Sequence, residues 1–159
     1  MYLLNNDHPN QIEETTFAEL GKKESYIEEI LRKNVDMICD DVESMLIVGQ
    51  QVKNQKNGRS DLTAMDDDGN IVLIEIKRDK KDIELRREAF EFQAIRYAAS
   101  CATIKSTDEL IQNVFAPYVE KHKAEFQTAG TLTSTEIAQR SLDDFIRTND
   151  IKSFNERQR

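Results

Sequence analysis

Two carboxylates and an amine lie close together in the segment from Arg59 to Arg78, RSDLTAMDDDGNIVLIEIKR. Asp61 stands before one apolar run, and Glu75 and Lys77 stand at the end of the next, where alternation would call for apolar side chains. Carboxylate oxygens are the ligands that Mg²⁺ prefers, and an ammonium group can neutralise a phosphate. These residue types in this order indicate a magnesium-dependent phosphodiesterase site.

A β-hairpin would bring these side chains together. Residues 71–76 form a β-branched-rich run and residues 62–65 a weaker one, with turn-forming residues between them. A two-residue turn would place Asp61 and Glu75 on opposite faces of the sheet. A three-residue loop closed by Gly69 in the left-handed conformation would pair them on one face. We favour the second register because it has the glycine where a positive φ is required.

The environment of these residues distinguishes two interpretations. Opposed residues have Cβ atoms roughly 5 Å apart, so two carboxylates there repel unless a cation lies between them. We therefore expect strain without metal, which Asp61→Asn would relieve. Lys77 follows Glu75 by two residues and shares its face. The alternative is a surface hairpin with an ordinary Glu75 to Lys77 ion pair, but the apolar surroundings favour a catalytic site.

The order of Asp61, a hairpin and Glu75-Ile76-Lys77 resembles the core of the PD-(D/E)xK superfamily of restriction-endonuclease-like nucleases. One departure is that Ser60 stands where these proteins usually have a proline. That position varies within the superfamily, so the difference weakens the resemblance more than it affects the chemistry.

The resemblance extends over residues 27–99 and is closest to the nuclease domains of recombination helicases. Their Q-x-x-x-Y motif is matched by Gln93 and Tyr97 in FEFQAIRYAA, which would brace the site or contact substrate. The acidic residue of their N-terminal helix is matched by Glu28, with Glu29 as the other choice. Tyr97 also lies on an apolar helical stripe, so a role in the core remains the alternative.

The resemblance implies a fold, a metal and an activity. The fold would be α/β, a mixed central sheet flanked by helices in the order α-β-β-β-α, with extra C-terminal helices. Asp61, Glu75 and the backbone carbonyl of Ile76 would hold one or two Mg²⁺ ions, with Mn²⁺ as a substitute, and Lys77 and Glu28 would complete the catalytic set. The implied activity is hydrolysis of DNA phosphodiester bonds, with internal cleavage favoured over cleavage from an end. The alternative is a non-catalytic module that binds nucleic acid or protein.

The charge distribution bears on DNA as the partner. The net charge is −8, whereas DNA-binding proteins normally present a basic surface. Residues 1–50 hold eleven acidic and four basic side chains, and residues 51–97 hold ten of each. Lys53, Lys56 and Arg59 form a run without acidic residues, which we expect to contact the DNA backbone. Solvated loop residues are the alternative interpretation of this run.

Length and composition indicate a modest domain with a core of its own. A chain of 159 residues can bury about 70% of its unfolded surface. We assign residues 1–127 to the nuclease-like domain and residues 128–159 to a linker and a helical extension. Cys39 and Cys101 lack metal-ligand spacing, which predicts reduced thiols. A cytoplasmic location without a membrane partner, a homodimer and a further C-terminal domain complete the expectations.

Periodicity and capping signals predict the remaining elements. Two capping boxes are predicted where a Ser or Thr is followed three residues later by Glu, at Ser106 with Glu109 and at Thr133 with Glu136. The predicted helices cover residues 24–38, 83–102, 106–123 and 133–147, and the predicted strands outside the hairpin cover residues 11–17 and 46–53.

Overall fold

A small antiparallel sheet lies at the centre of the molecule, with helices on both faces. The structure is a computed structural model and describes residues 2–5, 8–39, 43–53, 59–79, 84, 90–126 and 132–156. The sheet has the order β3-β4-β5, formed by β3 (Met45–Lys53), β4 (Arg59–Asp66) and β5 (Ile71–Ile74). The mixed α/β class is therefore confirmed, and every strand pair in the described ranges is antiparallel.

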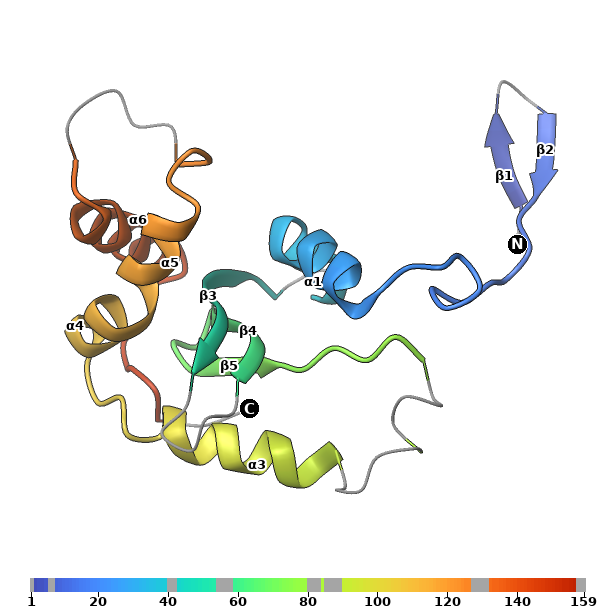
Figure 1. The fold of residues 1–159 in the computed structure, drawn as a ribbon. Helices are drawn as coiled ribbons and strands as arrows, with labels where there is room; N and C mark the ends of the chain where they lie inside the picture. Colours follow the sequence, from blue (N-terminus) through green and yellow to red (C-terminus); the bar gives the residue numbers. More distant parts are fainter. Residues whose placement is uncertain are drawn as a thin grey trace.

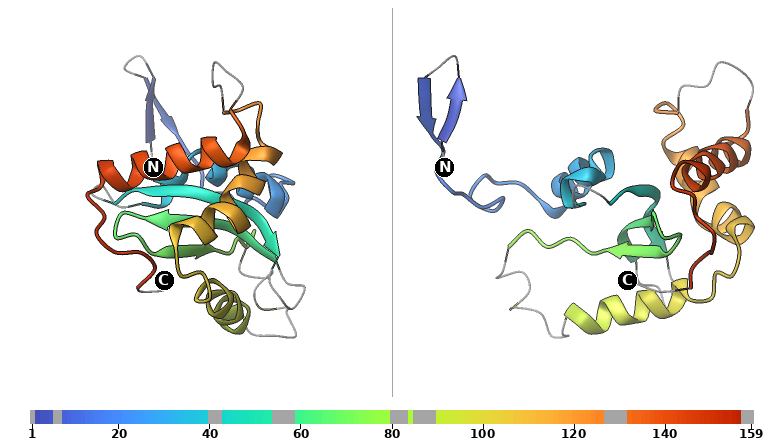
Figure 2. Two further views of the ribbon diagram at one scale, coloured as in Figure 1. Left: turned by 90° about the vertical axis from the view of Figure 1, so that its left-hand side faces the viewer. Right: turned by 180° about the vertical axis from the view of Figure 1, so that it is seen from behind.

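The helices divide between the two faces and one edge of this sheet. On one face lies α1 (Glu24–Lys33), and α4 (Thr107–Leu110), α5 (Ala116–Lys121) and α6 (Ser134–Thr148) cover the other (Figures 1 and 2). At the β5 edge lies α3 (Phe90–Cys101). The strands β1 (Tyr2–Asn5) and β2 (His8–Gln11) form a separate hairpin. No helix in the part of the chain that the structure describes is long and apolar enough to span a membrane.

The central hairpin has the predicted three-residue loop. Leu62 in β4 lies opposite Ile74 in β5, so the next step of this register sets Asp61 opposite Glu75. Gly69 has a φ of +84°, and its N–H donates to the carbonyl at the start of the loop over 3.0 Å. The glycine therefore determines which face of the sheet receives Asp61.

Two predicted elements near the N-terminus differ from the structure. The helix predicted over residues 24–38 ends at Lys33, and a 3₁₀ turn follows at Val35–Ile38. Asn34 separates the two, and its side-chain amide donates to the carbonyl of Ile30 over 2.9 Å. Asparagine competes with the backbone for hydrogen bonds in this way and so favours helix ends. The strand predicted over residues 11–17 is wrong, because β2 ends at Gln11.

The helix predicted over residues 106–123 is interrupted. Ser106 caps α4 by accepting from the N–H of Glu109, but the predicted box is only half formed, because the Glu109 side chain accepts from the N–H of Lys105 instead. A π-helical turn, Ile111–Phe115, then separates α4 from α5. In this turn the N–H of Ala116 donates to the carbonyl of Ile111, five residues back. Pro117 lacks an N–H, and its ring crowds the carbonyl four residues back in an α-helix. The wider turn just before Pro117 relieves that crowding.

The C-terminal helix shares the core of the sheet. Thr133 and Glu136 form the predicted capping box, and α6 ends at Thr148, close to the predicted boundary. Its Leu142 is fully buried in the same apolar cluster as Leu62 of β4. The start predicted for α3 near residue 83 lies outside the described residues.

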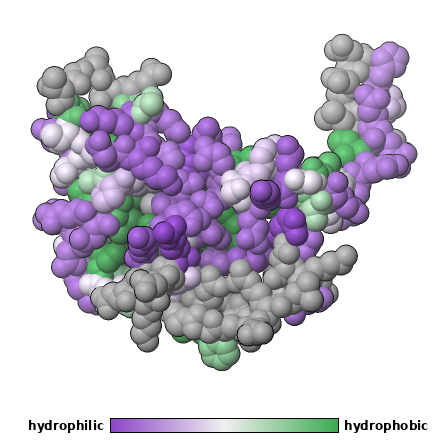
Figure 3. All heavy atoms as spheres, viewed as in Figure 1, coloured by the Kyte–Doolittle hydropathy of each residue, from purple (hydrophilic) through white to green (hydrophobic). Residues whose placement is uncertain are grey.

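Apolar side chains gather inside, and the surface is mainly hydrophilic on the face that Figure 3 shows. Exceptions on the described surface include Phe92 and Ile95 of α3, which are 61% and 60% exposed. Cys39 and Cys101 are half-buried, and burial raises the pKa of the Cys101 thiol to about 11. Cys101 is therefore a protonated thiol at neutral pH rather than a nucleophile.

Candidate carboxylate and lysine site

The oxygens predicted to hold a metal ion converge on the ammonium group of Lys77. Its Nζ lies 2.7 Å from Oε1 of Glu75, 2.7 Å from the carbonyl oxygen of Ile76 and 3.9 Å from Oδ2 of Asp61. The side chains of Lys77 and Glu75 are only 6% and 8% exposed, and that of Asp61 is 21% exposed. The two carboxylates therefore lie beside a buried cation that the chain itself supplies.

Asp61 also determines the path of the chain after β5. The ladder between β4 and β5 ends at Ile74, and beyond it Oδ2 of Asp61 accepts a hydrogen bond of 2.7 Å from the N–H of Ile76. Ile76 is 5% exposed and belongs to the core cluster. The hydrogen bond holds the backbone of Ile76, and burial holds its side chain. Together they fix the positions of its two neighbours in sequence, Glu75 and Lys77.

Gln51 joins the N-terminal helix to this cluster, and sequence analysis missed it. Its Nε2 donates to Oε2 of Glu28 over 2.8 Å and lies 3.4 Å from Oδ1 of Asp61. Gln51 has a φ of +55°, a left-handed conformation that costs a residue other than glycine about 1–3 kcal/mol, and residues strained in this way cluster at functional sites. The available signal was the pair of glutamines that interrupts the apolar run of β3.

Of the two acidic candidates on α1, the structure brings Glu28 to the site. Glu28 is 6% exposed and reaches Asp61 through Gln51. Glu29 instead pairs with Arg32 one turn further along the same helix. The sequence could not decide between these neighbours, because both fit the helical period.

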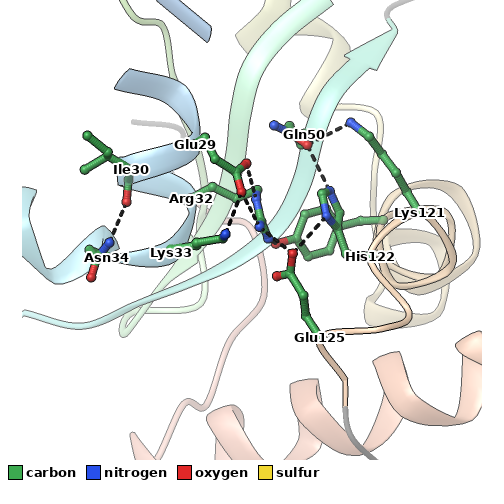
Figure 4. A network of polar contacts seen from close by, with 10 residues as sticks. Glu29, Ile30, Arg32, Lys33, Asn34, Gln50, Lys121, His122 and Glu125 are labelled. Atoms are coloured by element: carbon green, nitrogen blue, oxygen red, sulfur yellow. Dashed lines mark hydrogen bonds and ion pairs between the residues drawn. The ribbon is translucent and has the colours of Figure 1, made fainter. Parts of the chain in front are cut away.

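Arg32 fixes α1 against the segment after the π-helical turn (Figure 4). Its side chain is 2% exposed and donates to the carboxylates of Glu29 and Glu125, each over 2.8 Å, and to the hydroxyl of Tyr118 over 3.0 Å. The hydrogen bond from Arg32 lowers the pKa of Glu29 to about 2. The same kind of bond lowers the pKa of Glu125. Since Arg32 lies one turn beyond Glu28, this anchor also sets the position of Glu28.

A second set of contacts in the same network reaches β3 (Figure 4). Oε1 of Gln50 accepts a hydrogen bond of 2.7 Å from Nζ of Lys121 and lies 2.9 Å from Nε2 of His122. Burial, and then the charge of Arg32, lowers the pKa of His122. Because Gln50 precedes Gln51, the end of α5 holds the strand residue next to the site.

The remaining predicted residues lie at the same end of the sheet as Asp61, away from the hairpin loop. Tyr97 is 7% exposed, and its hydroxyl accepts a hydrogen bond of 3.1 Å from the backbone N–H of Arg59. Lys53 and Arg59 are exposed and lie opposite each other at the ends of β3 and β4. Gln93 lies on α3, but its side chain is not described, and Lys56 lies outside the described residues. Tyr97 thus braces the strand that leads to Asp61.

The donor set fits a hard divalent cation with few protein ligands. Among the residues that the structure describes, no group of three or more His, Cys, Asp or Glu side chains could hold a metal ion. Mg²⁺ needs fewer, because it keeps several waters and often binds through one or two carboxylates. Asp61, Glu75 and the carbonyl of Ile76 present three oxygens to one cation position.

Comparisons of the chain with protein-family models, with curated proteins and with solved structures find no match. The resemblance to PD-(D/E)xK nucleases therefore remains a prediction from the residues of the hairpin.

Proposed function

We propose that this chain is a metal-dependent nuclease domain with a restriction-endonuclease-like core that hydrolyses phosphodiester bonds in DNA. The observation that supports this most is the convergence of Asp61, Glu75 and the Ile76 carbonyl on one cation position. A position that accepts a lysine ammonium between two carboxylates can accept a small divalent cation when the lysine turns aside. Mg²⁺ bound there would polarise a scissile phosphate and lower the pKa of an attacking water.

Each residue of the site has a role that follows from its contacts. Asp61 and Glu75 supply carboxylate ligands. Lys77, once turned away from Glu75, neutralises the negative charge that develops on the phosphate. Gln51 and Glu28 are positioning residues, because the amide of Gln51 links the two carboxylates of Glu28 and Asp61.

The basic residues at the end of the β3 and β4 pair would guide the substrate. Lys53 and Arg59 lie opposite each other and are exposed, so both can contact phosphate groups. The net charge of −8 makes this local pair more important, because the molecule as a whole repels DNA. We expect weak DNA binding that falls steeply with salt.

Cleavage assays test the proposal directly. Wild-type protein should cut plasmid, linear or branched DNA in the presence of Mg²⁺ or Mn²⁺, and nicking of a closed circular plasmid would identify internal cleavage. Glu75→Ala and Lys77→Ala should each lower the rate at least a hundredfold, about 3 kcal/mol. Asp144→Ala, which changes an exposed carboxylate on α6, is the matched control and should leave the rate unchanged. Full activity in Glu75→Ala would rule out the proposed site.

The second candidate is a non-catalytic module that keeps this fold and binds nucleic acid or protein. It is favoured by the closed contact between Lys77 and Glu75, which gives both side chains a counter-charge without metal. In that case no DNA form is cut, and the addition of Mn²⁺ leaves the melting temperature unchanged. The two candidates therefore differ in both the cleavage assay and the thermal melt.

A further inference from the structure

A cavity of about 210 Å³ lies between the sheet and α3, and no role in catalysis has been assigned to it. Its apolar walls include Leu73 of β5, Ile104 after α3 and Val114 of the π-helical turn. Sites for drug-sized ligands usually measure roughly 300–1,000 Å³. This cavity is therefore large enough for one ring system and too small for a longer molecule.

Two buried hydroxyl groups at this cavity are hydrogen-bonded to each other. Oγ of Ser60 and Oγ1 of Thr63 lie 3.2 Å apart, and the two residues are 4% and 1% exposed. Each hydroxyl has one proton to donate, and their mutual bond uses only one of the two. Among the residues that the structure describes, this is the hydrogen bond that these two side chains make. One O–H of the pair can therefore donate to an acceptor inside the cavity.

Two further polar groups at the cavity are available to a ligand. Lys53, whose side chain ends in an ammonium group, and Asn113, whose side chain ends in an amide, both line it, and both residues are exposed. Neither side chain makes a hydrogen bond or ion pair within the described ranges. Asn113 lies in the π-helical turn, Ile111–Phe115, and such turns occur frequently at functional sites. The cavity thus offers a cation, an amide and a hydroxyl donor around an apolar interior.

We propose that this cavity binds a single nucleotide unit, with the base inside and the phosphate at Lys53. The apolar walls would contact the faces of the ring. The hydroxyl pair of Ser60 and Thr63 and the amide of Asn113 would bond to polar atoms on its edge. The choice of a nucleotide over other planar anions rests on the proposed nuclease function, whereas the cavity and the polar groups around it do not.

The unit could be a free nucleotide or the terminal nucleotide of a strand, and both present the same chemistry to the cavity. Ser60 directly precedes Asp61 on β4, so an occupied cavity would contact the strand that carries the catalytic carboxylate. Binding of a terminal nucleotide would hold the end of a strand beside the site. Binding of a free nucleotide would instead make the site respond to the concentration of nucleotides.

Binding measurements with two probes distinguish these sources. Isothermal titration of the full chain would use the four 5′-deoxynucleoside monophosphates and a five-nucleotide single strand, in chelator so that no cleavage occurs. Saturable binding of a monophosphate indicates the free nucleotide, and binding of the strand alone indicates the terminal unit. Absence of binding by both probes would overturn the proposal.

Variants assign the binding to the cavity. The double variant Ser60→Ala and Thr63→Val removes both hydroxyls and should weaken nucleotide binding at least tenfold. Asn113→Ala should weaken it as much, and because it changes an exposed residue it should leave folding intact. Lys53→Gln should weaken the binding of monophosphates but not the binding of nucleosides, which lack the phosphate. The control Lys123→Gln changes an exposed lysine near the end of α5 and should leave the binding of monophosphates unchanged. Wild-type affinity in Asn113→Ala and Lys53→Gln would overturn the proposal. Glu75→Gln distinguishes a failure of this proposal from a failure of the proposed nuclease function. The variant removes a predicted metal ligand and leaves the cavity unchanged, so it should still bind the nucleotide.

Discussion

At the scale of single residues, Lys77 decides how the site behaves without metal. Its ammonium contacts the oxygens that a divalent cation would need, so the two cations compete. Lys77→Met removes the competitor and should give a larger rise in melting temperature with Mn²⁺ than wild type, since a ligand at a hundred times its Kd stabilises by about 2.7 kcal/mol. Glu75→Gln should lose the rise. Thermal melts with chelator and with millimolar Mn²⁺ measure both, and equal shifts in all three proteins would mean that these oxygens bind no metal.

The same ammonium reverses the effect expected for Asp61→Asn. Two opposed carboxylates alone would make this substitution stabilising. In the structure, however, Oδ2 of Asp61 accepts a hydrogen bond from Ile76 and lies 3.9 Å from Nζ of Lys77. Replacing a charged acceptor by a neutral one should therefore lower the free energy of unfolding by about 1 kcal/mol, the difference between charged and neutral hydrogen bonds. Urea unfolding in chelator measures the change, and a more stable variant would show that repulsion dominates.

Sequence reasoning found the residues of the site that interrupt a pattern and missed the one that depends on backbone conformation. Asp61, Glu75 and Lys77 stand out because charged groups are costly in an apolar strand pair. Gln51 matters because its backbone turns to a φ of +55°, and no local rule assigns that conformation to glutamine. Its position depends on Glu28 and Asp61, which are distant in sequence.

At the scale of elements, the hairpin loop is fixed from outside by the C-terminal segment. The N–H of Asn155 donates to the carbonyl of Gly69 over 2.8 Å, and a Cβ at Gly69 would lie 2.6 Å from Cγ2 of Ile151 and collide with the carbonyl of Ser153. Gly69→Ala should therefore destabilise the protein by more than about 2 kcal/mol, combining a left-handed alanine with displacement of this segment.

Gly21→Ala is the matched control for that substitution. Gly21 also has a positive φ, +66°, but a Cβ there would meet nothing within 4 Å. It should cost only about 1 kcal/mol, the conformational part of the effect. Urea unfolding of both variants measures the difference, and equal losses would mean that the C-terminal segment does not hold the loop.

The predicted helix starts and the predicted hairpin turn are confirmed where a single residue determines the local backbone. Gly69 determines the hairpin register, and Ser106 and Thr133 determine two helix starts through their own side-chain bonds. The π-helical turn before Pro117 was missed because the apolar pattern continues through it. A pattern of side chains shows which face of a helix is buried. It does not show whether a backbone N–H bonds to the carbonyl four residues back or to the one five residues back.

At the scale of the whole molecule, the site depends on contacts between distant parts of the chain. Arg32 on α1 bonds to Glu125, and Gln50 on β3 bonds to Lys121. Neither pair leaves a signal in the sequence, because each residue alone reads as an ordinary polar surface group. Long-range pairs of this kind decide where α1 lies against the sheet, and therefore whether Glu28 reaches Asp61.

The Arg32 anchor should make the folded state sensitive to acid. The pKa of Glu29 is lowered from 4.5 to about 2 by its hydrogen bond to Arg32, and the pKa of Glu125 is lowered by the same residue. A carboxylate with a lowered pKa in the folded state binds fewer protons there than in the unfolded chain. Its contribution to stability is therefore complete above pH 4.5 and is lost as the pH falls toward about 2.

Arg32→Gln should consequently flatten the fall of melting temperature over this pH range, besides lowering stability at neutral pH. Arg147→Gln is the matched control, because it breaks an exposed ion pair with Asp144 whose side chains are 79% and 67% exposed. Exposed pairs of this kind contribute little, so its melting curve should follow that of wild type at every pH. Thermal melts at intervals from pH 7 to pH 2 compare the three slopes. A slope in Arg32→Gln as steep as that of wild type would show that other carboxylates carry the acid sensitivity and that Arg32 does not hold α1 through its charge.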